Sequence, residues 1–221
     1  SEKMTAFASQ KWHCGLLLAA ALLSGCATSR SVVAPQIDAV ANPAQGIAVR
    51  IERIDDARRF EVDPPEPSIP SLMDNQLADD ALRSRAIARK RNTFGKALGD
   101  VLLPEGQSVA KLTESAITRT FRAAGYRVLG VDDPDYAQAI PVSGRVEKLW
   151  AWFRPGFWAL ALEANYEVTL STTIAALQRN PKLTGQVRNT MQIATEDDWS
   201  AIVTKALDDF SARLQDRLLD R

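Results

Sequence analysis

Thiol and imidazole groups, which often act as nucleophiles or metal ligands, are confined to the first 26 residues of this 221-residue chain. They belong to His13, Cys14 and Cys26, the only histidine and the only cysteines of the sequence. Cys26 follows two small residues, Ser24 and Gly25, which leave the backbone accessible to a peptidase. A thiol is a nucleophile that can be alkylated to a thioether.

The residues before Cys26 have the pattern of a secretory leader. Lys3 and Lys11 precede an uncharged apolar run over 15–23, and small residues follow the run. The run is shorter than the roughly 20 apolar residues that a membrane-spanning helix needs. It therefore indicates a signal peptide over 1–25 that is removed from the mature protein.

The segment Leu23-Ser24-Gly25-Cys26 resembles the lipobox of bacterial lipoproteins. This resemblance implies that Cys26 becomes the acylated N-terminus and that a lipid bilayer is a partner of the protein. Ala27 follows Cys26 where inner-membrane lipoproteins carry Asp, which by resemblance to the enteric sorting rule implies an outer-membrane anchor facing the periplasm. Because two or three acyl chains bind far more firmly than one, we expect a permanent anchor.

Removal of the leader leaves a chain with no histidine and a single, acylated cysteine. This composition excludes disulfides within the chain, Cys/His zinc sites, cysteine nucleophiles and Ser-His-Asp triads. The formal net charge of 0 argues against general nucleic-acid binding. Glu163 and Glu167 are candidates for a carboxylate pair, with a solvated strand face as the alternative, and Asp55, Asp56 and Asp63 are a weak cation pattern. We expect no catalytic residues, no metal and no cofactor.

The segment from Trp150 to Trp158, WAWFRPGFW, contains three of the five tryptophans. Its Arg-Pro-Gly centre favours a turn, because Pro fixes φ and Gly can adopt a positive φ. The segment therefore predicts an aromatic hairpin tip. Its rings could contact lipid headgroups or an apolar pocket of a partner, or they could fold back over the sheet. The candidate residues for partner or membrane binding are Trp150, Trp152, Phe153, Arg154, Phe157 and Trp158.

The first half of the mature chain has few regular patterns. Residues 26–45 predict an acylated N-terminus and a linker from the membrane surface, and alternation over 47–52 predicts a strand. Four prolines within 63–72 predict a loop over about 60–78. Residues 79–96 favour a helix with a basic run that is either a solvated face or a contact for anionic lipid headgroups. This run comprises Arg83, Arg85, Arg89, Lys90 and Arg91.

The second half has clearer periodicity. Gly125 is placed to end a helix, Asn180 and Pro181 are placed to turn a hairpin, and Thr195 with Asp198 resembles a capping box. The predicted elements are a helix over 109–124, strands over 126–129, 140–150, 160–174 and 183–193, and a helix over 199–218.

These elements define one α+β domain over 46–221, with a mainly antiparallel sheet of four to five strands and helices packed on one face. The lipobox, the Gly125-Tyr126-Arg127-Val128 turn after a helix, the paired strands and the terminal helix together resemble the YajG-like uncharacterised bacterial lipoproteins. That resemblance implies envelope maintenance or assembly. We expect a non-enzymatic binding role with an envelope protein partner, in a transport or assembly complex, and the alternative is a carrier of a lipid or other hydrophobic ligand.

Overall fold

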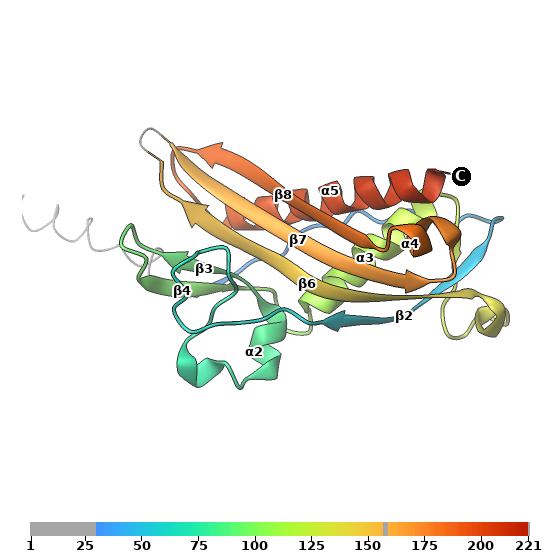
Figure 1. Cartoon of the computed structure of the whole chain (residues 1–221), viewed down its shortest axis with the longest axis horizontal. Helices are drawn as coiled ribbons and strands as arrows, with labels where there is room; N and C mark the ends of the chain where they lie inside the picture. Colours follow the sequence, from blue (N-terminus) through green and yellow to red (C-terminus); the bar gives the residue numbers. More distant parts are fainter. Residues whose placement is uncertain (1–29, 157–158, 221) are drawn as a thin grey trace, which may run out of the picture.

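A single mixed sheet runs along the molecule (Figure 1). The computed structural model describes residues 30–156 and 159–220. Within these residues the strands are β1 (Ser31–Val32), β2 (Ala48–Asp56), β3 (Ala86–Arg91), β4 (Ala97–Leu102), β5 (Arg127–Val128), β6 (Ile140–Arg154), β7 (Leu160–Thr172) and β8 (Lys182–Met191). The helices are η1 (Asp74–Gln76), α2 (Asp80–Arg85), α3 (Val109–Ala123), η2 (Tyr136–Gln138), α4 (Ala175–Arg179) and α5 (Glu196–Leu219). None of these helices has the length and apolar character to cross a bilayer.

Strand β6 joins the parts of the sheet. On one side, β7 pairs with it antiparallel from Val142 to Arg154, and β8 pairs with β7. On the other side, the first half of β6 pairs in parallel with β2, and its second half pairs in parallel with β3 at Ala151. The sheet continues from β2 to β5, and from β3 to β4 and β1. It therefore divides into two arms on that side of β6.

The α+β class is confirmed, but the expected antiparallel sheet of four to five strands is wrong. The described residues form an eight-stranded sheet in which four of the seven strand pairings are parallel. The hairpin expected from 160–174 and 183–193 is confirmed as β7 and β8. Parallel neighbours such as β2 and β6 lie far apart in the chain, so alternation within each strand does not reveal their pairing.

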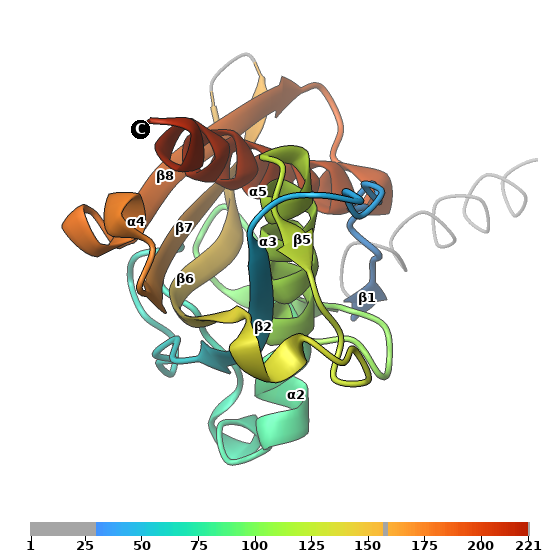
Figure 2. The ribbon, with the colours of Figure 1, turned by 90° about the vertical axis from the view of Figure 1, so that its right-hand side faces the viewer.

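Helices α3 and α5 cover one face of the sheet and lie against each other (Figure 2). Both begin at caps that the sequence supplies. The Ser108 hydroxyl accepts from the Lys111 backbone N–H, and Thr195 and Asp198 form the expected capping box. Gly125 ends α3 with a φ of 89°. The large buried side chains between these helices and the sheet include Phe121, Tyr166, Trp199 and Phe210.

The expected linker over 26–45 is corrected from Arg30 onward, because this stretch packs against the domain. Val33 is buried, and its N–H donates to the Leu102 carbonyl. Further along, Asn42 exchanges two hydrogen bonds with the backbone of Val128. Burial alternates residue by residue over 31–36, as in a half-buried strand, but the segment is short and has few large side chains, so its composition resembles that of a linker.

The expected helix over 79–96 is also corrected. Helix α2 ends at Arg85, and the following residues form β3, which is held between β4 and β6. Arg89 and Lys90 of the basic run are buried in this strand, so neither belongs to a solvated helix face or to a lipid-contacting surface. Ala, Arg and Lys favour helix locally, but pairing with two neighbouring strands outweighs that weak preference.

Candidate functional site

The candidate aromatic residues of β6 lie on both faces of the sheet. Phe153 packs at the edge of the core beneath the helices, whereas Trp150 and Trp152 face the opposite side. These two tryptophans are buried, with 1% and 2% of their surface exposed. They therefore do not form an exposed contact surface, and the alternative in which the rings fold back over the sheet holds for both. Phe157 and Trp158 lie outside the described residues.

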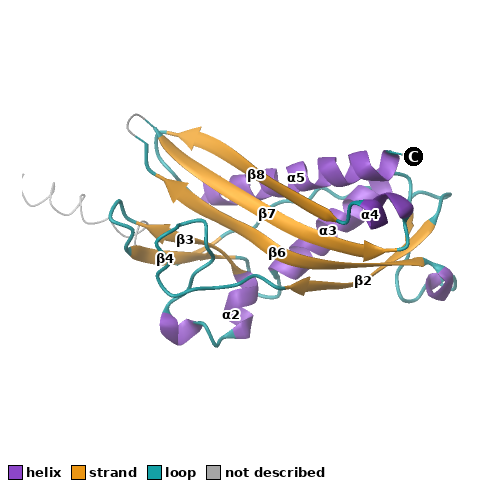
Figure 3. Cartoon of the chain, viewed as in Figure 1, coloured by secondary structure: helices purple, strands orange, loops and turns teal. Residues whose placement is uncertain are grey.

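A Pro-rich segment, residues 57–79 between β2 and α2, covers the two tryptophans. It is loop except for η1 (Figure 3). The Trp150 indole N–H donates to the Pro67 carbonyl at 3.2 Å, and the ring of Phe60 meets that of Trp150 edge to face at 5.8 Å. Leu72 completes the buried contact. The segment therefore acts as a third layer on the face opposite the helices.

Two arginines fix this cover in place, Arg58, which is buried, and Arg91, which is half-buried. The Arg58 guanidinium has no exposed surface; it pairs with Asp56 at 2.8 Å and donates to three backbone carbonyls of neighbouring elements. Arg91 of β3 donates to the Pro64 carbonyl at 2.7 Å and to the Ser71 hydroxyl at 3.2 Å. A buried guanidinium is stable only when its donors are satisfied, so these contacts hold the segment in one position.

The candidate carboxylate pair is already neutralised within the sheet. Glu163 is buried, and it pairs with Arg154 at 3.1 Å and with Arg188 at 3.6 Å. Glu167 pairs with Lys182 and with Lys148. Hydrogen bonds from these two lysines lower the pKa of Glu167 although partial burial opposes the shift. A glycosidase acid needs a raised carboxyl pKa, so Glu167 lacks that property.

Two of the three aspartates that the sequence suggested as cation ligands form ion pairs with arginines instead. Asp55 pairs with Arg53, and Asp56 pairs with Arg58. Among the residues that the structure describes, no three His, Cys, Asp or Glu side chains come together in a group suited to a metal ion.

Two hairpin turns and the loop before α5 lie at the same end of the sheet (Figure 1). They do so because β3 runs parallel to β6 and because Leu160 of β7 pairs with Met191 at the end of β8. We call this region the hairpin end, and it comprises residues 92–96, 154–156 and 192–195. Phe94 at the tip of the first turn is 94% exposed, and Ile193 is 76% exposed. The sequence interpretation overlooked Phe94, although Asn92 and Gly95 around it are typical turn residues.

The turn that presents Phe94 is rigidly built. The Asn92 side-chain oxygen accepts from the backbone N–H groups of Phe94 and Lys96, at 3.0 and 2.9 Å. Gly95 has a φ of 81°, a conformation that favours glycine. The aromatic ring is therefore held out from the end of the sheet by the local backbone.

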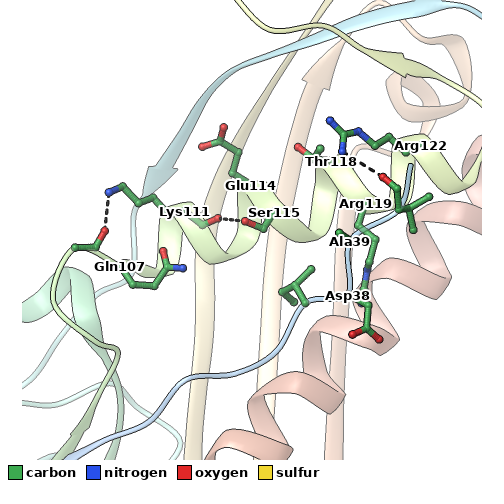
Figure 4. A pocket seen from close by; sticks show the side chains of 12 residues that line it. Asp38, Ala39, Gln107, Lys111, Glu114, Ser115, Thr118, Arg119 and Arg122 are labelled. Carbon is green, nitrogen blue, oxygen red and sulfur yellow. Dashed lines mark hydrogen bonds between the residues drawn. The ribbon is translucent and has the colours of Figure 1, made fainter. Parts of the chain in front are cut away.

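A polar groove of about 560 Å³ lies between α3 and the segment 37–40 (Figure 4). Arg122 donates to the Val40 carbonyl at 3.2 Å across it. Arg119 points away toward α5, where it contacts Asp208 at 2.9 Å and Ser211 at 2.8 Å. The cations lining this groove are thus largely committed to contacts within the protein, and its polar lining does not suit a lipid chain.

A second pocket, of about 530 Å³, lies at the opposite end from the hairpin turns, beside the C-terminal end of α3 and the last turn of α5. Its lining includes Ile47, Tyr126, Ile174 and Leu218. Ile47 is 57% exposed, so this apolar surface is open to solvent.

Comparison with known proteins adds little to this geometry. No family model and no curated protein matches the sequence. Among the similar solved structures is an uncharacterised protein with 8% sequence identity and a TM-score of 0.42; the match covers 86% of this chain and 97% of that protein. Another is protein XCC0632 from Xanthomonas campestris, of family DUF330, with 11% sequence identity and a TM-score of 0.43; the match covers 84% of this chain and 91% of that protein. Likenesses this distant say nothing about what this chain does.

Proposed function

We propose that this chain is a lipoprotein of the bacterial envelope, anchored to the outer membrane through Cys26, that binds a protein partner and catalyses no reaction. The observation that supports it most is the position of the domain relative to the anchor. Arg30, the first residue that the structure describes, lies beside Asp100 of the domain and is four residues after Cys26. Four extended residues span at most about 14 Å. An acylated Cys26 would therefore hold the domain at the membrane surface, where an envelope complex assembles.

The Pro-rich segment is the surface that we propose for the partner. Its inner side is fixed over Trp150, whereas Val62 and Met73 on its outer side are 45% and 52% exposed. Proline-rich backbone is pre-ordered, so a partner that binds it loses little conformational entropy. The aromatic residues of β6 would then support the binding surface from below.

Mass spectrometry of the purified N-terminal peptide tests the anchor. We expect a mature chain that starts at an acylated Cys26, and a Cys26→Ser variant that no longer sediments with membranes. An unmodified thiol, or a wild type that remains in the supernatant, contradicts the anchor.

Affinity purification from membranes tests the partner surface. Val62→Asp combined with Met73→Asp should lose the protein that co-purifies with the wild type, while thermal unfolding stays unchanged because both side chains are exposed. Val131→Asp is the matched control, since Val131 is 76% exposed at another site. Equal recovery of the same partner by all three proteins would contradict the proposed surface.

A carrier of a hydrophobic ligand is the second candidate, and the apolar pocket beside α5 favours it. A fluorescent fatty acid should bind there, and Ala175→Trp should block it by filling the pocket, whereas Ala39→Trp in the polar groove should not. Binding that neither substitution changes, or no binding at all, argues against the carrier.

A further inference from the structure

The direction of β1 shows on which side of that strand Arg30, the first described residue, lies. β1 runs parallel to β4, with Ser31 beside Val101 and Val32 beside Leu102. Following β1 backwards therefore leads along β4 toward its first residue, Ala97, and the turn over 92–96. A contact of Arg30 supports this direction, because its guanidinium lies 3.5 Å from the carboxylate of Asp100, one residue before Val101 on β4.

Chain length limits how far an anchor can lie from this end. Arg30 lies beside Asp100, and Asp100 is three residue steps along β4 from Ala97, about 10 Å at the rise of a strand. The four residues from Cys26 to Arg30 span at most about 14 Å. The two lengths are similar, so acyl chains on Cys26 would enter a bilayer close to the hairpin end.

The hairpin end presents side chains suited to a lipid surface. Phe94 and Ile193 are the large apolar groups there, and both are mostly exposed. An aromatic ring and a branched apolar chain gain from leaving water, and the headgroup region accepts both. Lys96 is exposed beside Phe94, and the Arg154 side chain is half exposed on the next turn, so cations accompany the apolar groups.

Two of the acidic residues at this end accept hydrogen bonds from within the protein. Glu196 at the start of α5 accepts from the Ser31 hydroxyl at 2.6 Å, and Asp198 accepts from Thr195 in the capping box. Asp197 is exposed, and none of the hydrogen bonds or ion pairs described for α5 involves its side chain.

We propose that the hairpin end rests on the bilayer that carries the anchor, with Phe94 and Ile193 in the headgroup layer and Lys96 beside the lipid phosphates. The inference rests on the proposed acylation of Cys26 and adds an orientation to it. The protein would then stand on the membrane by its hairpin turns, with the long axis of the sheet directed away from the surface (Figure 1).

Single fluorescent labels on the full, lipidated protein test this orientation. The mature chain has no free thiol when Cys26 is acylated, so Phe94→Cys, Ile193→Cys and Val131→Cys each give one site for an environment-sensitive label such as NBD. Val131 is the control, because it is as exposed as Ile193 but lies in the loop between Val128 and Ile140, which both pair with Val49 at the opposite end of the sheet. The proteins are incorporated into vesicles of phosphatidylethanolamine and phosphatidylglycerol.

We expect the labels at 94 and 193 to shift their emission to the blue and to be quenched by lipids that carry a nitroxide near the headgroup. The label at 131 should keep its emission in water. Introducing Phe94→Glu should reduce the blue shift of the label at 193, which a mere local preference of the dye would not explain.

Two negative results have different meanings. If the protein floats with the vesicles while all three labels behave as in water, the orientation is overturned and the anchor stands. If the protein does not float and mass spectrometry finds Cys26 unmodified, the anchor and the orientation both fall.

Discussion

Replacement of Arg58 by methionine removes a buried charge on which the cover of the second sheet face depends. The guanidinium binds both carboxylate oxygens of Asp56 at 2.8 Å. It also donates to the carbonyls of Arg83, Ala86 and Leu149, which belong to α2, β3 and β6. Methionine fills a similar volume but offers no donor, so the carboxylate and these carbonyls lose their common partner.

The cost of this change follows from burial. Removing one partner of a buried ion pair costs about 3 to 5 kcal/mol, because the remaining charge stays without compensation. Asp56 is 19% exposed, so water relieves part of that penalty and the lower half of the range is expected. For a domain of this size, 1 kcal/mol corresponds to about 2 to 4 °C in Tm. Arg58→Met should therefore lower Tm by about 6 to 16 °C.

Urea unfolding followed by circular dichroism, with calorimetry for Tm, measures the loss. Arg53→Met is the matched control, since Arg53 pairs with Asp55 on the same strand but its side chain is 75% exposed. Exposed pairs contribute about 0 to 1 kcal/mol. If Arg58→Met were no less stable than Arg53→Met, the contacts of Arg58 would not hold the cover, and the argument for a fixed third layer would be refuted.

Three further predictions concern buried side chains of the two cores. Trp152→Ala should cost about 3 to 5 kcal/mol in chemical unfolding, as for other buried aromatic residues, whereas Arg145→Ala, on the same strand with a side chain that is 63% exposed, should cost far less; equal losses would show that Trp152 is not buried. Burial and the hydrogen bond to Asp209 raise the pKa of Tyr166 above its ordinary value of 10.0. Above pH 10 the phenol ionises more readily in the unfolded chain than in the folded one, so the free energy of unfolding of the wild type should fall. Tyr166→Phe should reduce this fall in unfolding measurements made over a series of pH values. Gly185→Ala would place a methyl group against the Tyr166 ring and should cost about 1 to 3 kcal/mol, while unchanged thermal stability would show that the ring can move.

Elements whose stability is local were predictable from the sequence. Helix α3 has its apolar stripe, its Ser108 cap and its terminal Gly125 within one stretch of chain. Helix α5 begins at a capping box of adjacent residues, and the β7–β8 pair is joined by a short connection. Each of these features needs only contacts between near neighbours, so periodicity and cap chemistry suffice to find it.

Elements that depend on distant partners were not predictable in the same way. β3 has a helix-favouring sequence, and it is a strand because β4 and β6 flank it. The segment after Arg30 has no helical or long strand pattern, and it is ordered because β4 offers an edge for β1. Tertiary pairing supplies these contacts, and no property of the single segment shows that the pairing partner exists.

The aromatic run of β6 lacks the alternation of apolar and polar residues that a strand with one solvated face shows. Leu149, Ala151 and Phe153 face the helices, and Trp150 and Trp152 face the other side, so five consecutive apolar residues serve two cores. A strand with one solvated face alternates apolar and polar residues, whereas an unbroken apolar run needs cover on both faces. The run is therefore typical of a strand that is covered on both faces, and the Pro-rich segment forms the second cover. Trp150 and Trp152 are buried beneath the Pro-rich segment. A partner that binds this part of the protein therefore contacts the outer side of that segment and not the tryptophan rings of β6.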